Sequence, residues 1–537
     1  MAEETLQEQS YRRIRQAVAE ASTATGDATS QAQTLPGPDR LSAARAAIPS
    51  DATGPGFLVG RGARATIDHI LDDLTPALTG QNLSGRYYGF VTGSTLPVAE
   101  VADNIVTAFD QNVQVHLPGQ TIATDVEDAA LEMLLGLLDL GGREVWGGRI
   151  FTTGATGSNI LGLACGREHV VTEAASRRQQ EGSERKEVAS IGELGILQAC
   201  VQAGVTDIQV LTSMGHSSLS KAAGIIGLGR ASVKELPLSA QEPWRLDLDA
   251  VEEQLTRQRE TGMVSIIAVS AGEVNTSRFA AAGLADMRRL RELADRHGAW
   301  IHVDGAFAIF ARTLPQTPEF ALLYELAAGI ELADSITVDG HKILNVPYDC
   351  GMFFTRRASI LQDVCRNPNA AYLTATTPGA AGCPAVEIHS PLNIGLENSR
   401  RWRALPVYAT LLSEGREGVA AMVARMVRLA RKVAGFVRAS EDYELLPEQG
   451  GSHAGEDEDR STAFVVLFRA RDDGLNSVLV QRIQESREWY VSGTKWDGRP
   501  ACRIAVSSWR VNVDEDAEFV KGWLERLARE HKENGKK

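Results

Sequence analysis

Short runs of β-branched and other apolar residues alternate with longer amphipathic stretches through the middle of this chain. Five runs have the length and flanking glycine or polar residues of buried strands; they span 150–153, 208–212, 264–269, 300–303 and 335–338. Between the third and fourth, apolar residues recur at helical spacing from Leu284 to Leu293, and Gly298 is placed to end that helix. This alternation predicts an α/β fold, with a mostly parallel sheet covered by helices on both faces. Ligands of such sheets bind at the carboxyl ends of the strands.

The pattern before this region differs from it. Residues 1–55 are rich in Ala, Ser, Thr, Gln and Gly, which predicts a leader with a weak helix over 6–20 and a flexible stretch around 36–38. Residues 56–115 predict an N-terminal helical segment, with helical spacing over 66–74. We expect the large ligand-binding domain to occupy 116–395.

A smaller α+β domain is predicted for residues 396–537. A long helical pattern gives way to mixed strand and helix patterns, and a polar insert at 448–461 is expected to be a solvated loop. The expected helices and strands cover 400–437 (helix), 462–468 (strand), 476–488 (helix) and 502–506 (strand).

Composition excludes several classes of function. The 537 residues carry a formal charge of −14, which argues against nucleic acid as the main partner because phosphate backbones attract basic surfaces. Six cysteines form neither a CxxC pair nor a zinc-type spacing, so no metal site is expected. The charged N-terminus lacks the apolar core of a secretory signal, and no run approaches the roughly 20 apolar residues that span a bilayer. We therefore expect a cytoplasmic protein that binds no membrane.

A glycine-rich turn follows the first predicted strand. It reads Phe-Thr-Thr-Gly-Ala-Thr-Gly-Ser-Asn over 151–159 and precedes an apolar helix. Small residues let backbone N–H groups approach an anion, and the helix N-terminus adds partial positive charge. The turn is not a Walker loop, and an ordinary helix cap is the alternative interpretation.

Asp304 ends the fourth predicted strand. A buried carboxylate at a strand end is costly unless it meets a cation or hydrogen-bond donors. A protonated pyridine nitrogen is such a partner, and Gly305 and Ala306 would leave room for a flat ring. Capping of the following helix is the alternative role for this aspartate.

Lys342 closes the segment Asp339-Gly340-His341-Lys342 after the fifth predicted strand. A partly desolvated lysine at a strand end is suited to forming a Schiff base, whereas a bare His-Lys pair is more often a surface feature.

His216 follows the second predicted strand. Its imidazole could stack on an aromatic ring near a substrate carboxylate, although a satisfied structural histidine is the alternative.

The order of these four motifs resembles one family, the pyridoxal-phosphate-dependent decarboxylases of the aromatic-L-amino-acid and glutamate decarboxylase group (group II). The resemblance runs from about Gly85 to Arg510 and implies fold type I, as in aspartate aminotransferase, with pyridoxal 5'-phosphate as cofactor. It implies a phosphate site at Ala155 and Thr156, ring stacking by His216, a pyridine-nitrogen contact by Asp304 with Ala306 beneath the ring, and a Schiff base on Lys342 beside His341. Asp339 matches a position that often carries a polar phosphate contact, but a carboxylate there would repel phosphate.

The resemblance also extends to substrate-side positions. Tyr372 matches the mobile-loop tyrosine that protonates the α-carbon after CO2 leaves, which favours decarboxylation over oxidative aldehyde formation. Phe90 and Thr92 match a substrate-pocket segment, with a core strand as the alternative. Glu273 stands where relatives tend to have a small hydroxyl residue, and Pro406 replaces a usual lysine, so substrate identity does not transfer directly.

The expected function is therefore decarboxylation of an L-amino acid, with an aromatic one as the family-level expectation, by a homodimer whose active site lies at the subunit interface. The alternatives are another pyridoxal-phosphate reaction on the same scaffold (aldehyde synthesis, transamination or C–C bond formation) and a non-catalytic homologue.

Overall fold

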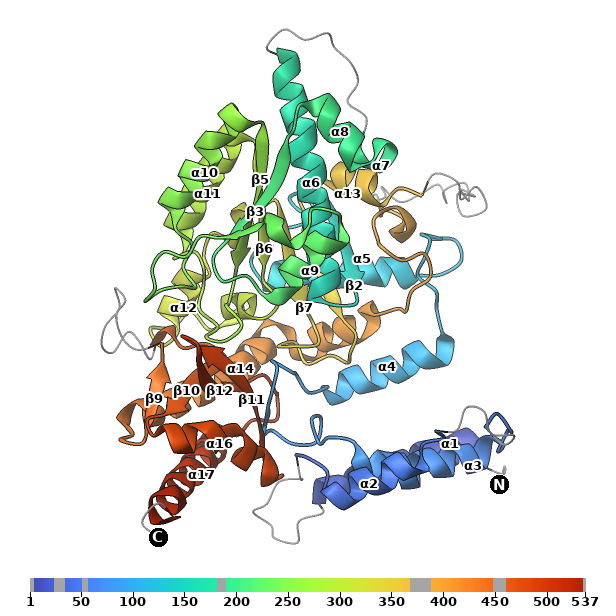
Figure 1. Ribbon diagram of the computed structural model, residues 1–537. Coiled ribbons are helices and arrows are strands. Elements are labelled where there is room, and N and C mark those ends of the chain that lie inside the picture. The colour runs from blue at the N-terminus through green and yellow to red at the C-terminus, as the bar shows by residue number, and fades with distance from the viewer. Residues whose placement is uncertain are drawn as a thin grey trace.

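Two β-sheets of unequal size organise the chain (Figure 1). The computed structural model describes residues 4–23, 34–50, 57–180, 190–367, 388–447 and 460–534. The larger sheet has seven strands in the order β2-β8-β7-β6-β5-β3-β4. In chain order these are β2 (Gly148–Thr152), β3 (Asp207–Thr212), β4 (Val233–Glu235), β5 (Met263–Ser270), β6 (Trp300–Asp304), β7 (Ser335–Asp339) and β8 (Gly351–Thr355).

All five predicted strands are present in this sheet, and β3, β4, β5, β6 and β7 pair in parallel. Two strands were not predicted. The β8 strand runs antiparallel between β2 and β7, and β4 is a short edge strand of three half-buried or exposed residues. A three-residue polar edge lacks the apolar signature by which sequence reasoning finds strands.

Successive residues of the central strands enter two separate cores, one on each face of the sheet. Ile266 and Ala268 pack with helix α6 (Ala155–Gln180), whereas Ile267 and Val269 face the other core. Burial on both faces explains why these strands read as continuous apolar runs. The helices around the sheet include α5 (Ala123–Leu137), α8 (Ile196–Ala203), α9 (Ser217–Ile225), α10 (Leu248–Thr261), α11 (Leu284–His297) and α13 (Ala358–Cys365). The expected cap is present, because Gly298 has the left-handed conformation.

The smaller sheet has the strand order β1-β11-β12-β10-β9. Its first strand, β1 (Tyr87–Tyr88), pairs in parallel with β11 and comes from far outside the predicted C-terminal domain. Helix α14 (Ala404–Ala439), which is kinked at Gly415, packs against α5, α4 (Pro97–Phe109) and α17 (Val513–Asn534). The remaining elements are β9 (Tyr443–Leu446), β10 (Val465–Ala470), α16 (Asp473–Glu485), β11 (Tyr490–Trp496) and β12 (Arg499–Ala505).

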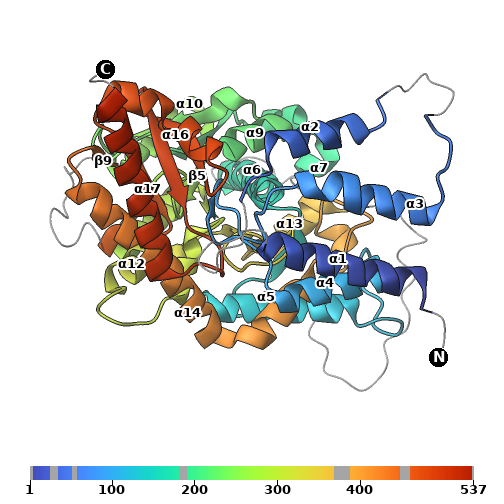
Figure 2. The same cartoon turned by 90° about the horizontal axis from the view of Figure 1, so that it is seen from below.

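Three N-terminal helices form a layer beside α4 (Figure 2). They are α1 (Leu6–Thr23), α2 (Pro38–Ala47) and α3 (Ala63–Asp68), which continues as a π-helix over 69–74. The helix expected over 6–20 is confirmed. Pro38, expected in a flexible stretch, is instead the first residue of α2, where a proline's fixed φ and missing N–H suit a helix start. Among the described residues, no helix is long and apolar enough to cross a membrane.

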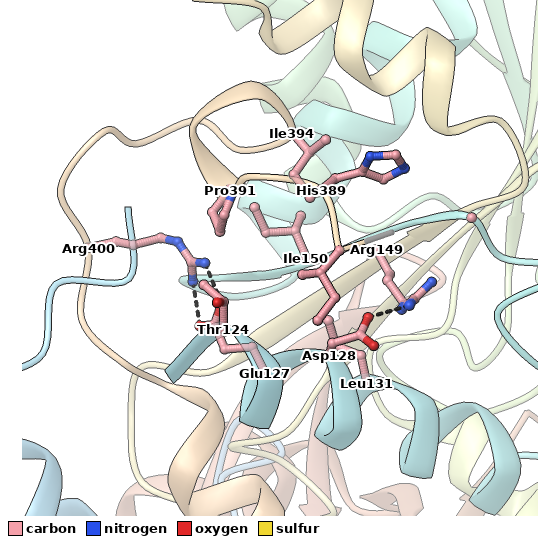
Figure 3. Close-up of a pocket in the computed structure, with 12 residues that line it drawn as sticks. Thr124, Glu127, Asp128, Leu131, Arg149, Ile150, His389, Pro391, Ile394 and Arg400 are labelled. Carbon is pink, nitrogen blue, oxygen red and sulfur yellow. Dashed lines mark hydrogen bonds and ion pairs between the residues drawn. The ribbon is translucent and has the colours of Figure 1, made fainter. Parts of the chain in front are cut away.

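Two buried ion pairs hold α5 against its surroundings (Figure 3). Arg400 donates two hydrogen bonds to Glu127 at 2.5 and 2.8 Å, and Arg149 of β2 pairs with Asp128. These four side chains and the apolar Ile150 line a pocket between α5, β2 and the segment before α14. The residues therefore tie the N-terminal part of the chain to the large sheet.

Candidate active site

One pocket gathers the residues predicted from four separate motifs. Ala155, His216, Asp304, Ala306 and Lys342 all line it. The other lining residues are Phe90, Val91, Ser270, Gly272, Val274 and Phe307. The pocket lies at the carboxyl ends of β2, β3, β5, β6 and β7, as expected for a parallel sheet.

The glycine-rich turn leads directly into α6, whose first residue is Ala155. Gly154 has φ +152°, and a Cβ there would lie 3.2 Å from Cε1 of His341, so this position favours glycine. The Ser158 hydroxyl lies 2.7 Å from that of Thr152 and donates to the carbonyl of Met352. Ser158 therefore braces the turn, and the predicted Thr156 is not among the residues that line the pocket.

Asp304 is held by donors from two sides. Its Oδ1 accepts the backbone N–H of Ala306 at 3.2 Å, and its Oδ2 accepts Nδ2 of Asn159 at 2.8 Å. Asn159 ends the predicted glycine-rich turn, but no role was predicted for it from the sequence. Only its place one turn into α6, facing the end of β6, reveals the contact.

Lys342 Nζ lies 2.9 Å from Oδ2 of Asp339 and 5.8 Å from the ring centroid of Phe307. The buried Asp339 therefore faces a cation, and its Oδ1 has no hydrogen-bond partner among the described residues. His341 Nδ1 accepts the backbone N–H of Cys350, and burial lowers the pKa of His341 despite the nearby Asp339. A neutral His341 thus leaves Lys342 as the cation that compensates Asp339.

His216 caps the N-terminus of α9. Its Nδ1 accepts the backbone N–H of Ser218 and lies 2.7 Å from the Ser218 hydroxyl. Partial burial lowers the pKa of His216, an effect that Lys342 and Arg503 reinforce and Asp304 opposes. The helix cap fixes the ring at the pocket, so the structural and the pocket-facing roles of this histidine are compatible.

The substrate-side segment carries backbone strain. Phe90 and Val91 have φ values of 59° and 66°, which are rare for non-glycine residues and rarer still for a β-branched one. Such strain persists only where surrounding contacts hold it, often at functional sites. Phe90 is anchored by its N–H to the Ser492 hydroxyl, and Thr92 is buried with its side chain near Tyr348.

Tyr348 was not identified from the sequence. Its ring lies 4.4 Å, centroid to centroid, from that of His341, and burial raises the pKa of its hydroxyl. The tyrosine follows Lys342 by six residues within an irregular segment, is half exposed and lies beside the pocket rather than in its lining, and no local pattern marks its contact with His341.

Glu273 does not line the pocket. Its carboxylate accepts hydrogen bonds from the backbone N–H groups and the side chains of Asn275 and Thr276. This turn presents the Val274 carbonyl to Nε of Arg503, whose pKa burial lowers to about 10 and whose Nη2 has no hydrogen-bond partner among the described residues. Glu273 therefore shapes the pocket wall indirectly. Tyr372 lies outside the described residues.

Comparison with known proteins identifies the family. A sequence model described as the pyridoxal-dependent decarboxylase conserved domain matches residues 101–453. The chain belongs to the pyridoxal-dependent decarboxylase family. The decarboxylase is 27% identical over 360 residues to the L-2,4-diaminobutyrate decarboxylase of Acinetobacter baumannii, covering 66% of this chain and 63% of that protein. It is 24% identical over 457 residues to the aromatic-L-amino-acid decarboxylase of Sus scrofa, covering 83% of each chain.

The fold of the decarboxylase is that of fold type I enzymes. The crystal structure of Oryza sativa TDC with PLP and tryptamine superposes with a TM-score of 0.75, at 20% sequence identity, over 99% of this chain and 100% of that one. This likeness confirms the predicted α/β architecture, and the family model confirms the predicted cofactor class.

The pocket fits pyridoxal 5'-phosphate. A Cβ on Gly154 would narrow the cradle at the start of α6, the expected phosphate end. At the other end, the Asp304 carboxylate offers an anionic partner for a protonated ring nitrogen. Lys342 offers an amine between these two ends, among apolar and small lining residues such as Phe307, Ala306 and Gly272.

Proposed function

We propose that this chain is an L-amino-acid decarboxylase that attaches pyridoxal 5'-phosphate through Lys342. The observation that carries the proposal is the convergence of Lys342, Asp304, His216 and Ala306 on one pocket beside the N-terminus of α6. These residues come from the ends of three strands, β3, β6 and β7, so a shared pocket is not expected unless the motifs serve one ligand.

When bound, the cofactor supplies an electron-withdrawing ring that accepts the electron pair left as the carboxylate is lost. Asp304 holds the proton on the ring nitrogen, Ala155 and Thr156 bind the phosphate, and His216 orients the ring by stacking. Asp339 keeps Lys342 within reach of the ring, since its Oδ2 lies 2.9 Å from Nζ. Tyr372 is proposed to return a proton to the α-carbon.

We infer an aromatic amino acid as substrate. Support comes from the apolar side chains of Phe90, Val91 and Phe307 in the pocket wall. The buried Arg503, with an unpaired Nη2 behind that wall, favours an acidic substrate as the second candidate. To decide between these two substrate classes, purified protein is incubated with aromatic, acidic and diamino L-amino acids. The products are then identified by mass spectrometry.

The same assay separates decarboxylation from other chemistry. An amine with CO2 supports the proposal. An aldehyde with ammonia and peroxide, or a keto acid, would assign the chain to another pyridoxal-phosphate reaction.

Attachment is tested directly. Borohydride reduction of the holoenzyme followed by peptide mapping is expected to label Lys342. The Lys342→Ala variant is expected to lose both this label and the absorbance band of the lysine-bound cofactor. Lys221, on α9 outside the pocket, provides the control variant Lys221→Ala, which should retain both. A label at another lysine contradicts the assignment.

We also propose a cytoplasmic homodimer with its active site at the subunit interface. Free thiols at Cys165, Cys200, Cys350, Cys365 and Cys502 support a reducing compartment. An exposed apolar stripe on α4 supports self-association.

A further inference from the structure

A chain of hydrogen bonds runs beneath the pocket from Trp300 to Asp304. Trp300 Nε1 lies 2.9 Å from the Ser335 hydroxyl, which lies 2.8 Å from Nδ1 of His302. Nε2 of His302 lies 3.0 Å from Oδ1 of Asn159, whose Nδ2 lies 2.8 Å from Oδ2 of Asp304. All of its members except Asp304 are fully buried.

The direction of the bonds is set at the Asp304 end. A carboxylate oxygen only accepts, so Asn159 directs Nδ2 toward Asp304 and Oδ1 toward His302. Nε2 of a neutral His302 then donates to Oδ1, and its Nδ1 accepts the Ser335 proton, while the Ser335 oxygen accepts the indole N–H of Trp300. The Thr337 hydroxyl donates to the same amide oxygen at 2.8 Å.

The second amide proton of Asn159 connects Asp304 to the other side of the pocket. Nδ2 also donates to the Ser218 hydroxyl at 3.1 Å, and that hydroxyl contacts Nδ1 of His216. The Asn159 amide therefore bonds to the Asp304 carboxylate and to the Ser218 hydroxyl, which contacts the His216 imidazole. Asp304 and His216 both line the pocket.

We propose that Asn159 is a positioning residue that fixes the Asp304 carboxylate against the cofactor's ring nitrogen, with its own amide held in place by His302 and Thr337. The inference rests on the proposed function, since it takes Asp304 as the residue that faces the ring nitrogen. A hydrogen bond from an amide to a carboxylate favours the charged form, which is the form that keeps the ring nitrogen protonated.

The surroundings keep the chain neutral and closely packed. Burial lowers the pKa of His302 to about 4, so the ring stays neutral near pH 7 and Ser335 keeps its acceptor. A Cβ on Gly162 of α6 would lie 2.2 Å from Cε1 of His302, so only glycine lets the helix lie this close to β6. This close approach brings Asn159, one turn earlier on α6, within reach of β6.

The test uses the holoenzyme with cofactor labelled with 15N in the ring. In Asn159→Leu, we expect the 15N resonance to move toward that of the unprotonated pyridine and the cofactor to bind about 10- to 100-fold more weakly, because a hydrogen bond to a charged group is lost. His302→Leu is expected to act in the same direction, whereas His302→Gln keeps an N–H donor near the Nε2 position and should restore most of the wild-type resonance.

Asn476→Leu is the matched control. Asn476 is a buried asparagine of α16 that bonds to Ala470 and Pro500, away from the pocket, so its loss should lower stability without moving the 15N resonance. If Asn159→Leu and His302→Leu both keep the wild-type resonance and affinity while Lys342 is labelled by borohydride, the inference is overturned and the proposed function stands. If the wild-type Lys342 is not labelled, both are overturned.

Discussion

Tyr348 is the side chain near Lys342 whose contribution is most open to test. Its hydroxyl lies near the Thr92 side chain on the substrate side, and its ring contacts His341. Tyr348→Phe removes this polar group without emptying the space, so we expect KM to rise about fivefold while kcat changes little. Steady-state kinetics of the decarboxylation measure both.

A double-mutant cycle sharpens that prediction. Because the Tyr348 hydroxyl acts through Thr92, adding Thr92→Val to Tyr348→Phe should change KM little further. Additive effects of the two substitutions, or a fall in kcat alone, would contradict a shared substrate-side role.

Residue by residue, the sequence predicted the pocket side chains that end a strand and missed those that depend on contacts. Lys342, Asp304 and His216 follow apolar runs, so the rule that strand ends share an edge brings them together. Asn159 and Tyr348 act through partners more than 100 and 200 residues away in sequence, and no periodicity encodes such a meeting. The Glu273 carboxylate accepts hydrogen bonds from its own turn. The sequence shows that a glutamate stands at this position, but it does not show which groups bind its side chain.

At the scale of elements, the packing of α6 on β6 and β8 makes stability depend on pH. Burial lowers the pKa values of His169 and His302 to about 4, from about 6.5 in the unfolded chain. Between pH 6.5 and pH 4 the unfolded chain binds protons on these histidines and the folded protein does not. The free energy of unfolding is therefore undiminished above pH 6.5 and falls as the pH is lowered toward 4. Each histidine contributes up to about 3 kcal/mol.

Urea denaturation at several pH values between 7 and 4 measures this loss. His169→Gln should reduce the slope of unfolding free energy against pH by about half. An unchanged slope in that variant would mean that other groups cause the pH dependence.

The buried pair of Glu127 and Arg400 fastens α5 to the segment before α14. The Arg400 side chain is 1% exposed, so Arg400→Leu leaves a buried carboxylate without its cation and is expected to cost about 3–5 kcal/mol in unfolding free energy. The double variant Glu127→Leu with Arg400→Leu should recover much of that loss, because no charge is then stranded.

The adjacent Arg401 is the control for this pair. Its bond to Asp103 is partly exposed, at 39% and 33%, so Arg401→Leu should cost less than about 1 kcal/mol. Equal losses from Arg400→Leu and Arg401→Leu, measured by urea denaturation, would show that burial of the pair does not matter.

The elements that sequence reasoning missed share a physical cause. The β8 strand is apolar, but only its pairing with β2 and β7 shows that it runs antiparallel. The two-residue strand β1 is recognisable only through its pairing with β11, about 400 residues later. Local patterns predict strands that are long and buried on both faces, and they do not predict pairing partners.

For the whole molecule, the exposed face of α4 is the surface that the proposed dimer would cover. Val101, Ile105 and Phe109 are spaced four residues apart on α4 and are 60%, 43% and 69% exposed. A stripe of this kind on one helix face is typical of an association surface. The strained segment at Phe90 and Val91 forms part of the pocket wall and comes shortly before α4 in the chain. A partner bound to α4 would therefore contact a helix that follows the pocket wall in sequence.

We therefore expect Phe109→Glu with Val101→Glu to weaken dimerisation at least about 100-fold, because each change removes an apolar contact and forces a charge into the interface. Sedimentation equilibrium over a range of concentrations measures the dissociation constant. Leu197→Glu is the control, since Leu197 is 82% exposed on α8 and lies on a different helix. If Leu197→Glu dissociates the protein and the α4 variant does not, the interface lies elsewhere. A wild-type protein that is monomeric at all concentrations would remove the basis for an active site shared between two subunits.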